Sequence, residues 1–308
     1  MDKPMTIFYL ILAMISGLCM AVQSPVNATL SRYAGNMQAT CISFGGGALC
    51  LGILMLLIGE GNLAAVTEAS WWQLLGGTYG IYIVLMITFA IPRLGAALTS
   101  TILTLGQLIT GTVLDTFGLL NLPKVELVPA RILGCLIVLV GIILVYIGKR
   151  KQENGRKAGS SNAAVILFLC LGGVAGAVQA PTNTALASHV GTIEASFVSF
   201  TVGFLCILTI TCIATKGHLM QNKKPGAEFW MLTGGIFGAA VVFINLTAIP
   251  HLGSTMLQIA TMLGQLSGGM LIDSFGLLGT NKIKANSWRW AGMLIIAMGV
   301  IVVTLSKL

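Results

Sequence analysis

Residues 106–120 read GQLITGTVLDTFGLL, and residues 264–278 read GQLSGGMLIDSFGLL. Nine of the fifteen positions are identical across a shift of 158 residues. Each copy carries one Gln and one Asp within a largely apolar segment. The chain is therefore predicted to contain an internal duplication whose polar positions are also duplicated.

The overall amino-acid composition is strongly apolar, as it is in these two stretches. Hydrophobic residues make up 56% of the 308 residues and charged residues only 8%, and 38 residues are glycine. Soluble domains carry about 25% charged residues, so this chain lacks the polar surface that a soluble fold needs. Strand-like alternation is absent. The composition predicts an all-α, polytopic membrane protein in which glycines allow close helix packing.

Apolar segments of about 20 residues, enough to cross about 30 Å of hydrocarbon, follow one another along the chain. We predict ten such spans: 6–28, 37–58, 71–91, 95–115, 131–148, 163–184, 194–214, 229–249, 253–273 and 288–306.

The duplication extends over the whole chain. AVQSPVNATL (21–30) returns as AVQAPTNTAL (177–186), and AIPRLGAAL (90–98) returns as AIPHLGSTM (248–256). Because the first span has a counterpart in mid-chain, we interpret it as a retained structural element and not as a cleaved signal peptide. The predicted organisation is a five-helix repeat, a polar linker and a second five-helix repeat, over residues 1–148, 149–162 and 163–308.

Five spans per repeat is an odd number, and the polar linker cannot cross the membrane. The second repeat must therefore enter from the face at which the first one left, so the two repeats are predicted to be inverted. Inverted repeats are typical of secondary transporters, whose substrate site lies near the bilayer midplane between them.

Basic residues test this topology. The face that would carry both termini holds four Lys and Arg residues, whereas the linker face holds thirteen. Because positively charged loops stay inside, the linker is predicted to be cytoplasmic and both termini outside. The net charge of +8 is spread over short loops, which makes nucleic acid a poor candidate partner.

Four motifs resemble one known family. They are Q-x-P-x-N in the first span, G-G-x-x-G in the third, I-P-x-L-G before the fourth, and G-Q-L with D-x-F-G-L closing it. The chain resembles the YdcZ-type family, a bacterial inner-membrane group within the drug/metabolite transporter (DMT) superfamily. Most members resemble one five-span unit, and this chain resembles two units fused. The resemblance implies a DMT-like inverted-repeat bundle that exports solutes by alternating access.

Amide side chains within the spans are the candidate substrate-binding residues: Gln23, Asn27, Gln107, Gln179, Asn183 and Gln265. Pro25 and Pro181 lie between the amides of the first and sixth spans. Since proline frees the carbonyl four residues earlier, both are predicted to break their helices beside the site. The alternative is a kink whose amides only bind neighbouring helices together.

Depth in the membrane suggests two layers around a central cavity, with Gln23 beside Gln265 and Gln179 beside Gln107. The alternative for these four amides is structural contact between helices. Tyr79, Tyr82 and Asn245 are further residues that could face a cavity.

Two carboxylates lie at the ends of spans, about 12 Å beyond Gln107 and Gln265 along the helix. Each faces an Arg at the start of the next span, which predicts the pairs Asp115–Arg131 and Asp273–Arg289. One interpretation is a structural ion pair that holds the loop. The other is a gate on each face that opens in alternate states.

No Asp, Glu, Lys, Arg or His lies in the middle of any predicted span, which favours a neutral or zwitterionic small-molecule cargo. The seven cysteines lie in apolar spans without metal-binding spacing, so no metal or cofactor is predicted. Motifs of an enzyme are absent as well. A secondary transporter in the lipid bilayer, as a monomer or homodimer, is the favoured interpretation. A channel or passive facilitator and a flippase of a lipid-linked intermediate are the alternatives.

Overall fold

The computed structural model describes residues 3–94, 96–152, 163–216, 226, 228–279, 282 and 286–305. The regular elements in these ranges are helices. The α-helices are α1 (Lys3–Ala34), α2 (Asn36–Ile58), α3 (Gly76–Leu94), α4 (Ala96–Phe117), α5 (Pro129–Gln152), α6 (Ala163–Val190), α7 (Thr192–Ala214), α8 (Gly234–Phe275) and α9 (Ser287–Leu305). The short 3₁₀ helices are η1 (Leu63–Glu68), η2 (Trp71–Leu75) and η3 (Phe229–Thr233).

Seven helices in the described part of the chain are long and apolar enough to cross a membrane. Two shorter apolar helical stretches, Trp71–Ile87 and Ile102–Phe117, lie between them in sequence. The all-helical, polytopic class is therefore confirmed. The count of ten crossings stays a prediction, although the described residues of the ten predicted segments are largely helical.

In the described part of the chain, a helix break lies at Gly253 and not at Pro25 or Pro181. Helix α8 runs through two predicted spans, and Gly253, at the start of the second span, adopts φ 76° and ψ 172°. That positive φ is open to glycine without a steric penalty. Helices α1 and α6, in contrast, continue past Pro25 and Pro181. The predicted breaks at these prolines are wrong, because packing against neighbouring helices lets a membrane helix tolerate one lost backbone hydrogen bond.

The duplicated stretches of the opening end their helices in the same way. Gly118 and Gly276 have φ of 65° and 68°. The Leu119 amide donates to the Leu114 carbonyl over 2.9 Å, and the Leu277 amide donates to the Ile272 carbonyl over 3.0 Å. A glycine in the left-handed conformation just past a helix is a common stop signal. The shared F-G-L-L therefore encodes a helix end.

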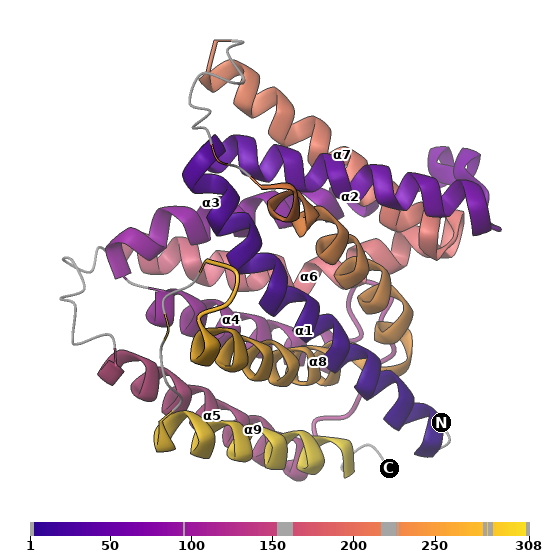
Figure 1. Cartoon of the computed structure of the whole chain (residues 1–308). Coiled ribbons are helices and arrows are strands. Elements are labelled where there is room, and N and C mark those ends of the chain that lie inside the picture. Colours follow the sequence, from indigo (N-terminus) through magenta and orange to yellow (C-terminus); the bar gives the residue numbers. More distant parts are fainter. Residues whose placement is uncertain are drawn as a thin grey trace.

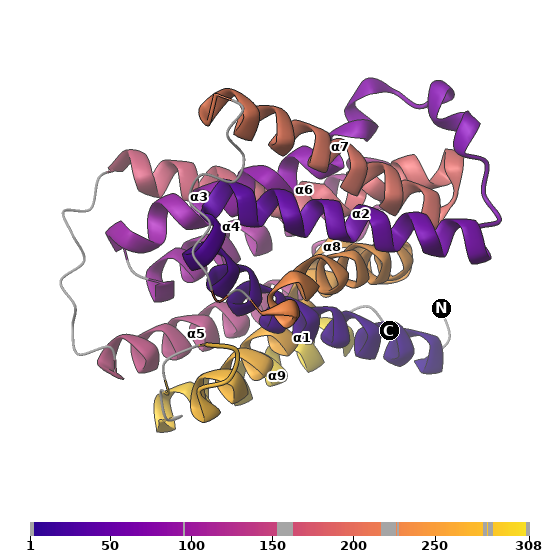
Figure 2. The same ribbon diagram turned by 45° about the horizontal axis from the view of Figure 1, so that its top comes forward.

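Helices in equivalent places of the two repeats run antiparallel. In α2 and α7, a Cβ added at Gly45 would lie 3.0 Å from the Phe204 ring, and one at Gly52 would lie 3.1 Å from the Phe197 ring. Residue numbers thus rise along one helix as they fall along the other. Figures 1 and 2 show α2 alongside α7.

The last helices of the two repeats, α5 and α9, also run antiparallel. A Cβ at Gly134 of α5 would lie 3.0 Å from the Val303 amide nitrogen of α9, and one at Gly148 would lie 3.0 Å from that of Arg289. Figure 1 shows α5 and α9 side by side at the lower edge of the bundle. The start of α1 and the end of α9 lie at one end of the bundle, whereas α5 ends and α6 begins at the opposite end.

The largest hydrophobic core surrounds the break in α8. Buried side chains on both sides of Gly253, including Ile249, Leu252, Leu257 and Ile259, pack with residues of α1, α4, α5, α6 and α9. Helix α8 therefore lies at the centre of the bundle, where its side chains can line an internal site.

Candidate functional site

The Q-x-P-x-N motif of α1 packs on the G-G-x-x-G motif of α8. A Cβ added at Gly234 would overlap Asn27 Oδ1, and one at Gly238 would overlap Gln23 Nε2. The missing glycine side chains thus leave the space that these two amides occupy, in keeping with small residues at close helix contacts.

Helix α6 makes the equivalent contact with α3. A Cβ at Gly76 would overlap Asn183 Oδ1, and one at Gly80 would lie 3.0 Å from Gln179 Nε2. The two motifs of one repeat therefore pack on those of the other, in a reciprocal manner. The Q-x-P-x-N and G-G-x-x-G motifs, which look independent in the sequence, therefore form the two surfaces of the same helix–helix contact.

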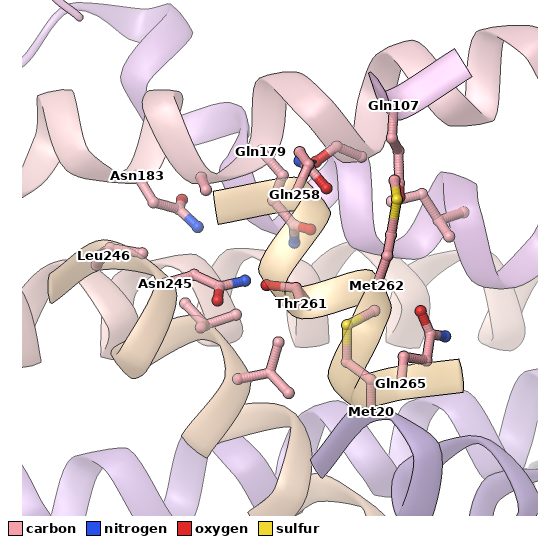
Figure 3. A pocket seen from close by; sticks show the side chains of 15 residues that line it. Met20, Gln107, Gln179, Asn183, Asn245, Leu246, Gln258, Thr261, Met262 and Gln265 are labelled. Carbon is pink, nitrogen blue, oxygen red and sulfur yellow. Dashed lines mark hydrogen bonds between the residues drawn. The ribbon is translucent and has the colours of Figure 1, made fainter. Parts of the chain in front are cut away.

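A cavity of about 80 Å³ lies between helices of both repeats (Figure 3). Its lining residues come from α1, α3, α4, α6 and both parts of α8: Met20, Ile83, Gln107, Gly176, Gln179, Ala180, Asn183, Val241, Val242, Asn245, Leu246, Gln258, Thr261, Met262 and Gln265.

Four of the six predicted binding residues line this cavity: Gln107, Gln179, Asn183 and Gln265. The other two, Gln23 and Asn27, are not among the described lining residues and pack on α8 as stated above. Of the two Q-x-P-x-N motifs, the one in α6 therefore contributes described lining residues to this cavity.

The two glutamines of one predicted layer, Gln107 and Gln179, both lie at the cavity. A Cβ at Gly176, which lies one turn before Gln179, would overlap Gln107 Nε2, and both glutamines line the cavity. In the other predicted layer, Gln265 lines the cavity whereas Gln23 lies against Gly238.

Three further polar residues line the cavity, and two of them have no polar equivalent in the first repeat. Asn245 was an expected cavity residue, and Gln258 and Thr261 were missed. The Asn245 Oδ1 accepts from Ser16 Oγ over 2.7 Å, and Gln258 Nε2 donates to the Gly176 carbonyl over 3.4 Å. Their equivalents in the first repeat are Ile87, Ser100 and Leu103. Of the two tyrosines expected at a cavity, Tyr82 donates instead to the Phe168 carbonyl over 3.1 Å.

Two lining side chains keep unpaired polar atoms. Asn183 is 1% exposed and Thr261 is 6% exposed. Neither amide atom of Asn183 has a hydrogen-bond partner in the structure, and neither does the Thr261 hydroxyl. In Figure 3 the Asn183 amide nitrogen points towards Gln179 and Asn245, and the Thr261 hydroxyl points towards Asn245. Unpaired buried groups are costly, so a ligand in the cavity could satisfy them.

The Asp115 carboxylate is a buried helix cap as well as an ion-pair partner. Its Oδ2 lies 2.5 Å from Arg131 Nη2, and the Asp115 side chain is fully buried. It also accepts from the Ser254 amide over 2.6 Å and from the Thr255 amide over 2.8 Å. These are the first amides after the break at Gly253, where a helix N-terminus favours negative charge.

The second ion pair is more open to solvent. Arg289 Nη2 donates to Asp273 Oδ2 over 2.8 Å, and the side chains are 4% and 16% exposed. Asn286 accepts from the Arg289 amide over 3.0 Å and donates to the Gly148 carbonyl over 2.8 Å. Both predicted pairs are thus formed in the same structure, one at each end of the bundle.

An apolar helical bundle with an amide-lined internal cavity has the architecture of a membrane protein that handles small molecules. A family model described as "Putative inner membrane exporter, YdcZ" matches residues 8–144 and again residues 164–302. The chain belongs to this family of the DMT superfamily. It is a multi-pass inner-membrane protein of the transporter class.

Structural comparison agrees with this fold. A crystal structure described as "Crystal structure of protein" has a TM-score of 0.67 and 16% sequence identity, and the similarity covers 99% of this chain and 98% of that one. At this identity the similarity concerns the fold alone. None of the curated proteins matches the chain.

Proposed function

We propose that the protein is a secondary transporter that exports a small neutral or zwitterionic molecule by alternating access, with the cavity as its substrate site. The observation that carries the proposal is the composition of the cavity wall. Both repeats contribute to the wall, and amides are its main polar groups.

Antiparallel packing of equivalent helices supports the inverted relation between repeats. Helix α2 corresponds to α7 and α5 to α9, and each pair runs in opposite directions. Two units with the same orientation would bring their equivalent helices together in parallel. An inverted pair is therefore the simpler account, and it agrees with an odd number of spans in each repeat.

Six lining residues form three repeat-related pairs: Met20 with Gly176, Ile83 with Val241, and Gln107 with Gln265. Residues that face their own equivalents lie about the pseudo-two-fold axis. In inverted repeats that axis lies in the plane of the membrane, near its middle. These pairs therefore support a site close to the midplane.

The rest of the cavity extends to one side of this axis. Asn183, Asn245, Gln258 and Thr261 line it. Three of their equivalents in the first repeat have described side chains, and none of these three, Asn27, Ile87 and Leu103, is a lining residue. In the inferred topology all four lie towards the face that carries the termini. This asymmetry is what one state of an alternating-access cycle requires, since the site then opens to one face at a time.

The inferred topology predicts the position of both termini. Alkaline phosphatase fused after residue 308 should be active, because it would reach the outside, and the same enzyme inserted at residue 155 should be inactive. Green fluorescent protein at the same two points should give the opposite result. Activity of the phosphatase at both points would contradict the inversion.

Counterflow in proteoliposomes tests the transport mechanism. Vesicles loaded with an excess of unlabelled solute should transiently accumulate the labelled solute, and initial rates should saturate. A channel would give unsaturable flux without accumulation. Scrambling of a labelled lipid-linked intermediate without solute counterflow would instead indicate a flippase.

Two glycine substitutions separate the cavity from its duplicate contact. Gly76→Ala should displace Asn183, and Gly234→Ala should displace Asn27, with similar steric conflict. Because only Asn183 lines the cavity, Gly76→Ala should lower the initial counterflow rate about tenfold, whereas Gly234→Ala should lower it by less than about threefold. Equal losses in two variants of equal thermal stability would contradict the assignment of the site.

A further inference from the structure

We infer that the cavity recognises an uncharged, short-chain polyol, bound through hydroxyl groups to the amide-lined wall. The inference rests on the proposed transport function and narrows its substrate class. Four properties of the cavity carry it: the absence of charge among its described lining residues, an occupied helix N-terminus, unpaired hydrogen-bonding atoms and a small volume.

Charge is the first criterion. None of the fifteen described lining residues is ionisable. An ion moved from water into such a wall would lose its hydration and gain no counter-charge, which is costly. A net anion or cation is therefore a poor match for this site.

The helix break removes the remaining way to bind a carboxylate. In transporters with discontinuous helices, the amides at a half-helix N-terminus can hold an anionic substrate group. Here the break at Gly253 exposes the amides of Ser254 and Thr255, but the Asp115 carboxylate already accepts from both. A zwitterion such as an amino acid would thus find neither a cationic side chain in the described wall nor these helix amides.

The polar side chains of the cavity wall are suited to ligand groups that can both donate and accept hydrogen bonds. Six carboxamides line it: Gln107, Gln179, Asn183, Asn245, Gln258 and Gln265. The unpaired atoms include an amide donor and an amide acceptor of Asn183 and the hydroxyl of Thr261. A carboxamide offers both donors and an acceptor, and a hydroxyl group can pair with either. Several hydroxyls on one skeleton can therefore satisfy this wall in more than one orientation.

Size and shape select a short, acyclic skeleton. A cavity of about 80 Å³ favours a small solute over a drug-sized one. None of the described lining residues is aromatic, so the wall lacks a ring on which a nucleobase, a sugar ring or an aromatic drug could stack. Met20 and Met262 supply adaptable apolar surface for the carbon chain.

The test uses the full-length protein in proteoliposomes and three solutes of similar size. Glycerol is neutral, glycerate is its anionic relative, and 2-aminopropane-1,3-diol is its cationic relative. Labelled erythritol, which crosses lipid slowly, should show counterflow that unlabelled glycerol and erythritol inhibit. The two charged relatives should inhibit at least tenfold less. Equal inhibition by glycerate or the amine would overturn the inference.

A substitution in the wall links this selectivity to the cavity. Thr261→Val keeps the side-chain shape and removes the hydroxyl, so the half-saturating erythritol concentration should rise roughly five- to tenfold. Thr182→Val is the matched control. Thr182 is also fully buried with an unpaired hydroxyl, but it does not line the cavity, and its substitution should leave transport unchanged. Equal effects of the two substitutions would contradict binding at this wall.

Failure of the inference and failure of the proposed function give different results. If a mixed panel of amino acids, amines and organic acids supports counterflow and polyols neither exchange nor compete, the polyol inference is wrong and the transporter stands. If no solute of either panel gives counterflow with a folded, monodisperse protein, both are wrong.

Discussion

Asp115→Ala should lower the free energy of unfolding by about 3–5 kcal/mol, because it leaves a buried arginine without its counter-charge. Arg131 is 4% exposed and Asp115 is fully buried. The same substitution removes the acceptor of the Ser254 and Thr255 amides. Reversible unfolding in mixed detergent micelles, followed by the fluorescence of the five tryptophans, measures the change.

A double variant separates the charge from the helix cap. In Asp115→Ala/Arg131→Met the unpaired charge is gone, and only the loss of the cap remains, which typically costs about 0.5–2 kcal/mol. The double variant should therefore be more stable than Asp115→Ala alone. A double variant as unstable as the single one would mean that the cap, and not the ion pair, dominates at this position.

Gly264→Ala should destabilise the bundle by about 1–3 kcal/mol through overpacking and strongly reduce transport. A Cβ at Gly264 would overlap the Met14 carbonyl oxygen of α1 and lie 2.8 Å from its carbonyl carbon. Backbone atoms cannot rotate away as a side chain can, so α1 must move away from α8. The neighbouring Gln265 lines the cavity, so this movement also changes the site.

Gly269→Ala is the control on the same helix. A Cβ there meets no atom within 4 Å, and alanine is a better helix former than glycine by about 1 kcal/mol. This variant should be as stable as the parent protein or slightly more stable, with unchanged transport. Thermal unfolding and erythritol counterflow of the two variants together check the prediction. Equal destabilisation would show that helix packing at Gly264 is looser than the structure indicates.

Several features of the fold followed from sequence alone because they are repeated or compositional. Low charge and long apolar segments exclude a soluble fold. The pairs Asp115–Arg131 and Asp273–Arg289 were predictable because each partner lies near a span end and the loop between them is short. Both ion pairs are formed in the structure.

Other features escaped sequence reasoning for physical reasons. Proline is the stronger helix breaker on average, yet α1 and α6 continue through Pro25 and Pro181 and the chain breaks at Gly253. The position of the break depends on what stabilises it, namely a carboxylate that lies 139 residues away from Ser254 in the sequence. Such a long-range contact leaves no local pattern.

The membrane class, the duplication and the polar residues shared by both copies could be predicted from the amino-acid sequence. These properties depend on composition and on comparing the chain with itself, which requires no knowledge of how helices rotate. Which amides face the cavity, in contrast, depends on how the helices pack in three dimensions. Helix rotation directs Gln179 and Asn183 to its wall, together with the unduplicated Asn245, Gln258 and Thr261. It also leaves Gln23 and Asn27 packed on the glycines of α8, because a side chain's surroundings depend on every neighbouring helix.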